Sequence, residues 1–365
     1  MTADPSFKVY SNLKKTTSEE EREQLLENPG FGKIFSDHMA MIRWSEKKGW
    51  HDAKITIRQP FQLDPASAVF HYAQEIFEGL KAYRGKNKCI LLFRPEENAS
   101  RFAHSAMRMA MPIIPKTLFI QAIEELVKID NKWIPEGEEK SLYLRPFMFA
   151  NEAFLGVRPA KQYIFSVIAS PVGTYFRGNG ESMILWVEEY LSRAIPGGTA
   201  TAKCGGNYAA SLEAQALAYK NGCDQVVFLD VKEHRWVEEI GGMNIFFVLK
   251  DGSLITPPLN GSILHGVTRS SILTLAKDAG LKTKECAYSF EEWKKDSATG
   301  CLKEVFACGT AAVITSISQV RHESGEFTIG DGKIGPIAQQ LRGKLIGIQR
   351  GMIHDPYGWV HTLQL

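Results

Sequence analysis

The segment at residues 171–180, PVGTYFRGNG, constrains the fold most, because it separates two strand-rich halves of the chain. It holds three glycines, one proline and one asparagine in ten residues, a composition typical of a linker. The full length of 365 residues is enough for two domains, at roughly 150 residues each. We therefore expect an N-terminal domain over 1–175, an interdomain loop over 176–181 and a C-terminal domain over 182–365.

Both halves mix strands and helices without strict alternation, which predicts an α+β fold in each. Apolar runs bounded by turn residues predict the strands, and residues 84–87 predict a hairpin turn. Pro95 opens one helical pattern, whereas Gly222 and Gly280 end two others. The expected strands cover 55–61, 80–83, 89–93, 142–149, 163–169, 183–187, 225–230, 236–240, 244–249, 304–307 and 313–317. The expected helices cover 96–110, 116–131, 207–221, 268–279 and 337–349, and residues 1–30 are expected to wrap the surface as a polar segment.

Charge and cysteine usage exclude several classes of protein. Lysine and arginine number 43 and aspartate and glutamate 41, so the net charge is +2 and a small-molecule partner is favoured over nucleic acid. Six cysteines occur with no C-x-x-C spacing, so we expect neither a disulfide framework nor a metal site. No apolar run suggests a signal peptide or a membrane span, which predicts a cytoplasmic protein.

The most unusual stretch surrounds Lys203, in PGGTATAKCGGNY at 196–208. P-loop, zincin and G-x-S-x-G hydrolase motifs are absent from the chain. Small residues flank Lys203 and leave room for a bulky planar group beside its amine. A lysine shielded from water loses its proton more easily and can form a Schiff base with a carbonyl. The alternative is a glycine-rich surface loop with a solvated lysine.

Other candidate residues carry weaker signals. Glu239 precedes Gly-Gly and an apolar strand, so it belongs either to an exposed hairpin or to a site where its carboxylate holds a protonated ring nitrogen. The turns at 264–268 and 308–311 are either simple caps or amide-rich phosphate sites, to which Arg101 adds a charge. Tyr143 and Arg145 share one strand face, and Arg145 needs either a structural acid or a substrate carboxylate as partner.

Taken together, these segments resemble the branched-chain amino acid aminotransferases, which are fold-type IV pyridoxal-phosphate enzymes. The resemblance extends from Phe31 to the last expected helix, and its motifs occur in the family's order and spacing. The motifs are FGKIFSDHM at 31–39, HY at 71–72 with FEGLKA at 77–82, LFRP at 92–95 through Arg101, SLYLRP at 141–146, KCGGNY at 203–208, EIGGMN at 239–244, TPPLNG at 256–261, and EVF at 304–306 with GTA at 309–311.

The resemblance implies a smaller N-terminal α/β domain and a larger, β-barrel-like C-terminal domain with flanking helices. It implies that Lys203 is the catalytic lysine, which binds pyridoxal 5'-phosphate covalently, and that Glu239 partners the pyridine nitrogen. Further cofactor contacts are implied for Arg101, Tyr208, Val267, Thr268 and Thr310. The substrate pocket is implied to be lined by Phe31, Tyr72, Phe77, Tyr143, Arg145, Tyr175, Gln225, Gly242 and Ala311. A homodimer is implied as well, in which Leu155 and Val157 reach the pocket of the partner subunit.

Two positions depart from the family pattern. Gly242 stands where some relatives have a threonine, so main-chain amides would have to replace a hydroxyl that contacts the substrate carboxylate. Ala312 and Thr315 stand where mammalian relatives have a C-x-x-C, so we expect no thiol switch.

Three other functions remain open at this stage. An aminodeoxychorismate lyase or a D-amino-acid aminotransferase of the same fold would use the same lysine and glutamate, although both are usually shorter. A binding protein without catalysis would have no reason to combine Lys203, Tyr208 and Glu239.

Overall fold

The computed structural model describes residues 6–10, 16–86, 89–137, 139–173 and 182–364. Its contacts divide the chain into two compact units. The first unit contains Met1–Tyr175, Ala202–Gly205 and Ile348–Leu365, and the second contains Phe176–Thr201 and Gly206–Gly347. The predicted interdomain loop lies outside the described residues.

The contacts differ from the predicted domains in two places. Residues 202–205 and 348–365 were expected in the second domain, but they group with the first unit. The physical reason is backbone hydrogen bonding, since the carbonyl of Lys203 accepts the N–H of Phe77 and Val360–Leu363 pairs with Ile90–Phe93. With these two additions the first unit contains more residues than the second.

The first unit is built on a nine-stranded, mostly antiparallel sheet. Its order is β1-β3-β2-β8-β7-β5-β6-β18, and β4 pairs with β7. The strands are β1 (Lys8–Tyr10), β2 (His38–Ser45), β3 (Gly49–Ile57), β4 (Glu75–Phe77), β5 (Leu80–Arg84), β6 (Ile90–Phe93), β7 (Ser141–Ala150), β8 (Gln162–Val172) and β18 (Val360–Leu363). The helices are α1 (Glu19–Glu27), α2 (Ala68–Tyr72), α3 (Pro95–Arg108) and α4 (Lys116–Ile129), with a 3₁₀ turn at Asn131–Trp133.

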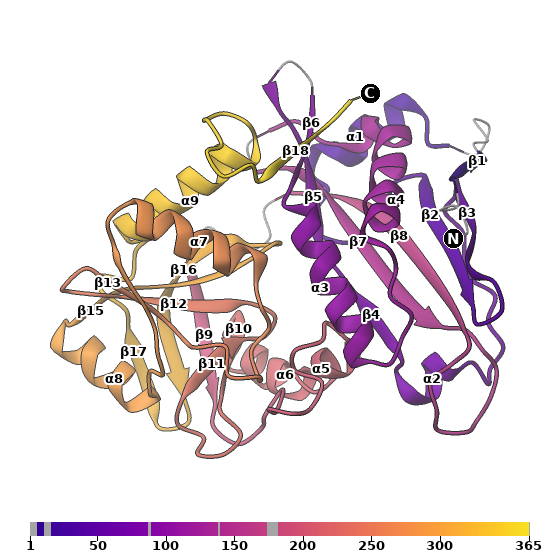
Figure 1. Ribbon diagram of the computed structural model, residues 1–365. Coiled ribbons are helices and arrows are strands. Elements are labelled where there is room, and N and C mark those ends of the chain that lie inside the picture. The colour runs from indigo at the N-terminus through magenta and orange to yellow at the C-terminus, as the bar shows by residue number, and fades with distance from the viewer. Residues whose placement is uncertain (1–5, 11–15, 87–88, 138, 174–181, 365) are drawn as a thin grey trace. The chain divides into compact units, whose positions relative to one another are not determined.

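Helices α3 and α4 cover one face of this sheet (Figure 1). Their apolar stripes meet at Phe102 and Phe119, whose ring centroids lie 5.2 Å apart. Both rings also contact Phe165 of β8, and all three side chains are fully buried. Burying each such ring contributes about 1.5–3 kcal/mol to stability. This core holds α3 against the strands that carry the predicted substrate residues.

The second unit is built on another nine-stranded sheet, of mixed direction. Its order is β11-β10-β9-β16-β15-β12-β13-β14, and β17 pairs with β16. A bridge between Ile240 and Met243 joins β11 to β12, so the sheet curls back on itself like part of a barrel. The strands are β9 (Ser182–Glu188), β10 (Gln225–Leu229), β11 (Val237–Ile240), β12 (Asn244–Leu249), β13 (Ser253–Thr256), β14 (Lys282–Glu285), β15 (Leu302–Gly309), β16 (Val313–His322) and β17 (Gly325–Thr328). The remaining helices are α5 (Gly205–Ala209), α6 (Leu212–Lys220), α7 (Val267–Asp278), α8 (Phe290–Thr299) and α9 (Pro336–Gln349).

Most predicted elements are confirmed, although several observed ones, such as β2 and α8, were not predicted. The helix expected over 207–221 is interrupted between α5 and α6, because both the amide and the hydroxyl of Ser211 bond to the carbonyl of Tyr208. The strand expected over 55–61 begins earlier and ends at Ile57. The polar segment over 1–30 contains helix α1, which begins after the capping residue Ser18. Among the described residues, no helix combines the length and apolar character needed to cross a membrane.

Candidate functional site

The backbone around Lys203 is held firmly within the first unit. Its N–H donates to Oγ of Ser105 at 2.9 Å, and its carbonyl accepts the N–H of Phe77 at 2.9 Å. Two residues on, the N–H of Gly205 donates to a carboxylate oxygen of Glu75. The Lys203 amine lies 4.8 Å from the centroid of the Phe77 ring. A half-buried lysine on an immobilised backbone favours a positioned amine over a solvated loop lysine.

Glu78, which is fully buried, forms an ion pair with Arg101 in the same unit. Nε and Nη2 of Arg101 reach the two carboxylate oxygens of Glu78 at 2.6 and 2.9 Å. Asn98 donates a further bond of 2.8 Å. Burial raises the pKa of Glu78, but the charges of Arg101 and Lys203 outweigh it and hold that pKa below its usual value. Arg101, predicted to bind phosphate, therefore already has one strong anionic partner.

Breaking the Glu78–Arg101 pair should destabilise the protein markedly. Glu78→Ala leaves a largely buried guanidinium without its carboxylate, and we expect a loss of about 3–5 kcal/mol in the free energy of unfolding at neutral pH. The matched control is Glu125→Ala, which breaks a partly exposed pair with Lys128 and should cost about 1 kcal/mol or less. The pKa of Glu78 is lowered on folding. The extra loss of stability in Glu78→Ala relative to Glu125→Ala should therefore persist at neutral pH and shrink as the pH falls through the folded pKa of Glu78. Equal losses in denaturant melts would contradict this.

Phe31, Phe77, Tyr143 and Arg145 form one cluster on the first unit. The guanidinium carbon of Arg145 lies 4.7 Å from the Phe77 ring centroid and 5.4 Å from that of Tyr143. Phe31 packs edge-on against Tyr143 at 5.3 Å. Gly79 leaves space for the Tyr143 hydroxyl, which would lie 2.0 Å from a Cβ at that position. The sequence prediction that these side chains share a site therefore agrees with their geometry.

Arg145 has no acidic partner within ion-pair distance among the described residues. Nη2 donates a long bond of 3.3 Å to the Tyr143 hydroxyl, while Nε is buried without a hydrogen-bond partner. A partly buried guanidinium whose Nε is fully buried and without a partner is poorly satisfied. Of the two partners that the sequence left open, this favours a substrate carboxylate over a structural acid.

Four other predicted substrate residues lie elsewhere or outside the described chain. The Tyr72 hydroxyl donates to the carbonyl of Leu155, and this contact ties α2 to the loop after β7. Leu155 and Val157 are 68% and 88% exposed, so their side chains are available to a partner subunit. Tyr175 lies outside the described residues. The roles of these four, like those of the other predicted site residues, remain predictions.

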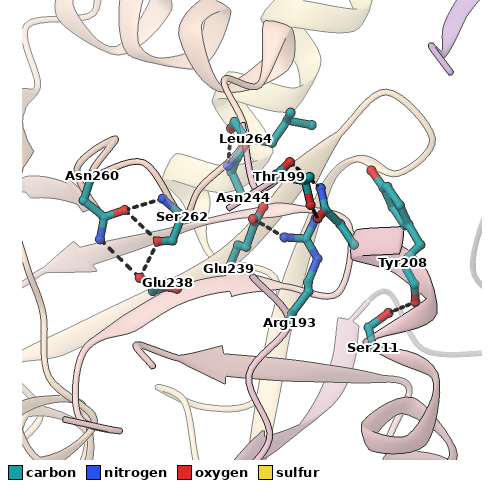
Figure 2. A network of polar contacts seen from close by, with 11 residues as sticks. Arg193, Thr199, Tyr208, Ser211, Glu238, Glu239, Asn244, Asn260, Ser262 and Leu264 are labelled. Carbon is teal, nitrogen blue, oxygen red and sulfur yellow. Dashed lines mark hydrogen bonds and ion pairs between the residues drawn. The ribbon is translucent and has the colours of Figure 1, made fainter. Parts of the chain in front are cut away.

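In the second unit, Glu239 is buried and ion-paired. It is 3% exposed, and its Oε1 accepts a bond of 2.6 Å from Nη1 of Arg193 (Figure 2). The alternative of an exposed hairpin is therefore wrong. The Arg193 guanidinium also lies 5.4 Å from the centroid of the Tyr208 ring. Burial opposes the charge of Arg193, but Glu239 and Tyr208 raise its pKa above the usual value. A partner for a protonated nitrogen must be a carboxylate, and the contact with the Arg193 cation favours that charged form over the neutral acid.

Arg193 was not among the predicted site residues. It lies 46 positions before Glu239 in an irregular segment after β9. The sequence YLSRAIP around it has no helical or strand period that would mark a buried charge. Only the requirement that the buried Glu239 needs a cation could have pointed to it.

Two buried polar groups hold the loop that leads into α7. Glu238 accepts bonds from the Asn260 amide at 3.1 Å and from the Ser262 hydroxyl, as Figure 2 shows. The side-chain amide of Asn244 donates a hydrogen bond of 3.3 Å to the carbonyl of Leu264. Burial raises the pKa of Glu238, and its bonds to the two donors only partly offset this. These contacts fix the loop relative to β11 and β12.

The start of α7 has the features of a phosphate site. Its N-cap is Gly266, and no side chain caps the helix. A Cβ on Gly266 would lie 2.1 Å from the side-chain oxygen of Asn244, so any larger residue there would displace the Asn244 side chain. Val267 and Thr268, both predicted phosphate contacts, form the first turn of this helix. The first amides of a helix have no partner within the helix and favour an anion. Thr310 and Ala311 lie in the turn between β15 and β16.

The turn after Glu239 brings Gln225, Gly242 and Tyr208 together. Gly241 has a φ of +47°, and a Cβ there would lie 2.6 Å from the Gln225 side-chain oxygen. A Cβ on Gly242 would approach the Tyr208 ring to 3.3 Å. A threonine at 242 would therefore press on Tyr208, which gives Gly242 a local packing role.

A dinucleotide-type pattern also occurs once, at residues 330–335, which read G-x-G-x-x-G. Here the preceding strand β17 belongs to an antiparallel hairpin rather than to a βαβ unit. The Glu304 carboxylate caps the following helix, at 3.0 Å from the amide of Ile337 and 2.9 Å from that of Ala338. An acid at this position excludes a phosphate, so the pattern is structural.

Comparison with known proteins identifies the family. The profile of the amino-transferase class IV family matches residues 75–320. This chain belongs to the class IV aminotransferases. It is therefore an enzyme that transfers amino groups, on a fold-type IV scaffold.

Individual branched-chain aminotransferases resemble this chain along almost their whole length. A probable branched-chain-amino-acid aminotransferase of Streptomyces coelicolor is 53% identical over 347 residues, which cover 95% of this chain and 96% of the relative. A branched-chain-amino-acid aminotransferase of Mycolicibacterium smegmatis is 52% identical over 361 residues, 98% of both chains. A solved T.th. branched-chain amino acid aminotransferase with pyridoxamine 5'-phosphate has a TM-score of 0.73 and 27% identity, over 89% of this chain and 99% of that one.

Proposed function

We propose that this class IV aminotransferase acts on branched-chain amino acids. It transfers the amino group of L-leucine, L-isoleucine or L-valine reversibly to 2-oxoglutarate, giving a branched 2-oxo acid and L-glutamate. The names of the relatives that match almost the whole chain support this substrate class. The observation that carries the proposal is Arg145, a poorly satisfied guanidinium against aromatic rings. Such a site accepts an apolar side chain in one half-reaction and a second carboxylate in the other.

We propose pyridoxal 5'-phosphate as the cofactor, and the chemistry of the chain's own groups fits it. Lys203 supplies an amine, the buried Glu239 supplies an ionised carboxylate for the ring nitrogen, and the uncapped start of α7 supplies amides for the phosphate. The T.th. relative was solved with the pyridoxamine form. When bound, this cofactor withdraws electrons from the substrate α-carbon and so stabilises the carbanion that deprotonation leaves.

The chain's own residues then have separate tasks. The neutral amine of Lys203 acts as the base, and its Nζ takes the proton from the substrate α-carbon. The hydrogen-bonded backbone of Lys203 holds this amine in position. Glu239 keeps the ring nitrogen protonated, and Arg193 keeps Glu239 ionised. The Tyr208 hydroxyl is assigned to the phenolic oxygen of the cofactor. Arg101, Val267, Thr268 and Thr310 are assigned to its phosphate.

The substrate side chain is assigned to the aromatic residues of the pocket. Phe31, Tyr72, Phe77 and Tyr175 suit an apolar branched chain. Arg145 and the hydroxyls of Tyr72 and Tyr143 suit the second carboxylate of glutamate, because charge-assisted bonds hold an anion in a dry site. The Tyr72 hydroxyl would have to exchange its bond to the Leu155 carbonyl for one to the substrate. Gln225, Gly242 and Ala311 of the second unit are also assigned to substrate binding.

Arg145→Ala should weaken the dicarboxylate substrates far more than the apolar ones. We expect kcat/KM for glutamate to fall about 100-fold, the value of a lost charged hydrogen bond of roughly 3 kcal/mol, and that for leucine to fall less than about tenfold. The control is Arg58→Ala, another arginine stacked on a phenylalanine ring, at 4.9 Å from Phe35. Equal losses for glutamate and leucine in half-reaction kinetics would remove the carboxylate role.

Product analysis distinguishes the proposed activity from the two enzymes of the same fold that the sequence had left open. An aminodeoxychorismate lyase would release pyruvate and an aromatic amine, whereas a transaminase releases a 2-oxo acid. A D-amino-acid aminotransferase would convert D-leucine in preference to L-leucine.

We also propose a cytoplasmic homodimer, in which Leu155 and Val157 complete the pocket of the partner subunit. Their exposure of 68% and 88% leaves both side chains free to be covered on association. Sedimentation would give the mass of the assembly, and a monomer at micromolar concentration would contradict the dimer.

A further inference from the structure

Glu75 lies at the beginning of β4 and was not among the predicted site residues. Its carboxylate accepts the N–H of Gly205, two residues after Lys203. A Cβ on Gly205 would lie 2.3 Å from that carboxylate oxygen, so the close approach requires glycine. Glu75 is thus in direct contact with the backbone that carries the catalytic lysine.

Glu75 also shares a face of the sheet with Arg145. Residues two apart on a strand point to the same side, so Glu75 lies with Phe77 on β4, and Arg145 lies with Phe147 on β7. Phe77 and Phe147 are direct partners in the β4–β7 pairing, which puts all four on one face. The Arg145 guanidinium leans over the Phe77 ring at 4.7 Å. Burial raises the pKa of Glu75, and the Gly205 amide and the positive charge of Arg145 lower it in part, so Glu75 lies within electrostatic reach of Arg145.

Arg145 makes no ion pair among the described residues, so Glu75 acts on it through space rather than by contact. An anion that reduces the positive potential around Arg145 weakens its attraction for any other anion that arrives there. A substrate carboxylate would feel this reduction, whereas an apolar side chain would not.

We propose that Glu75 is a specificity-determining residue, whose negative charge limits how strongly Arg145 attracts the second carboxylate of a dicarboxylate substrate. This rests on the proposed function, in which one pocket serves both glutamate and the branched-chain amino acids. In this proposal, Glu75 keeps the affinity for glutamate close enough to the affinity for the branched-chain amino acids for both half-reactions to proceed.

The test measures ligand binding to the cofactor-loaded enzyme at pH 8, without turnover. Glutarate serves as the dicarboxylate probe and 4-methylvalerate as the apolar monocarboxylate probe. Glu75→Gln keeps a hydrogen-bond acceptor for Gly205 but removes the charge. We expect its dissociation constant for glutarate to fall by about threefold to tenfold, and that for 4-methylvalerate to change less than twofold. Equal changes for the two probes, or none, would overturn the proposal.

A double-mutant cycle assigns the effect to Arg145. Glu75→Gln in an Arg145→Gln background should no longer tighten glutarate, because the charge that Glu75 opposes is gone. An effect of the same size in both backgrounds would also overturn the proposal. Glu46→Gln, which removes an exposed carboxylate paired with Lys161, is the matched control and should alter neither constant.

Two further measurements distinguish failure of the Glu75 proposal from failure of the proposed function. Glu75→Ala provides a second variant, which should tighten glutarate as Glu75→Gln does and in addition speed hydrogen exchange at the Gly205 amide. Turnover of leucine with 2-oxoglutarate by the unmodified enzyme is measured separately. Its absence would remove the proposed function, while the ratio of the two dissociation constants would still decide the role of Glu75.

Discussion

Lys203→Ala is expected to abolish transamination between leucine and 2-oxoglutarate. The substitution removes both the amine that binds the cofactor and the base that takes the α-proton. A positioned general base alone contributes about 10²–10⁴-fold, so the combined loss of kcat should reach at least about 10⁴-fold. The fold should survive, because the contacts of this segment with Ser105 and Phe77 are made by the Lys203 backbone.

Two controls separate loss of the amine from loss of structure. Lys220→Ala removes an exposed lysine at the end of α6 and should leave turnover unchanged. Small exogenous amines added to Lys203→Ala should restore part of the activity, since they can take the proton in place of Nζ. Steady-state turnover close to that of the unmodified enzyme in Lys203→Ala would show that another residue is the catalytic base.

Glu239→Gln is expected to cause the second largest loss of activity. A neutral amide cannot hold a protonated ring nitrogen as a carboxylate does, so the electron-withdrawing power of the cofactor falls. We expect kcat to decrease by about 10²–10⁴-fold, in the range found for removal of one key electrostatic or proton-holding group. The variant also leaves Arg193 buried without its anion, and breaking a buried pair in this way costs about 3–5 kcal/mol of stability.

The neighbouring glutamate provides the matched control for this prediction. Glu238 belongs to the same strand but bonds to Asn260 and Ser262 instead of Arg193. Glu238→Gln retains an oxygen acceptor for these donors, so its loss of kcat should be much smaller. Measuring kcat, cofactor dissociation and denaturant melts for both variants separates electronic from structural effects. Equal losses of kcat in folded, cofactor-saturated enzyme would contradict the role of Glu239.

Much of the fold could be predicted from the sequence because local signals agreed with the tertiary structure. The apolar pattern of 142–149 and 163–169 predicts strands that β7 and β8 confirm with slightly longer bounds. Pro95 occupies the first turn of α3, as its fixed φ favours. Strand β2 was missed because its first five residues are all buried, so it has no alternating pattern.

Helix α8 shows a signal that was present but unused. Ser289 and Glu292 form a complete capping box, in which each side chain bonds the backbone of the other. The spacing S-x-x-E before an apolar residue marks such a start in the sequence alone. The helix was therefore predictable from its cap, although not from its period.

The candidate site was predictable residue by residue only through the family resemblance. Lys203 and Glu239 stood out because of the small residues and glycines around them. The sequence still allowed a solvated loop lysine at Lys203 and an exposed hairpin at Glu239. The burial of Glu239 and the partners of Arg101 and Arg145 depend on contacts between distant segments. Arg193 and Glu75 were missed for the same reason, since each acts on a residue far along the chain.

The most direct test of the central claim is an absorption spectrum of the purified protein before and after excess L-leucine, without any 2-oxo acid. A cofactor held by Lys203 should give a visible band, and leucine should convert it to the spectrum of the pyridoxamine form, with release of 4-methyl-2-oxopentanoate. A visible band that leucine leaves unchanged would contradict the substrate class. The lack of any such band after incubation with pyridoxal 5'-phosphate would contradict the assignment of Lys203 itself.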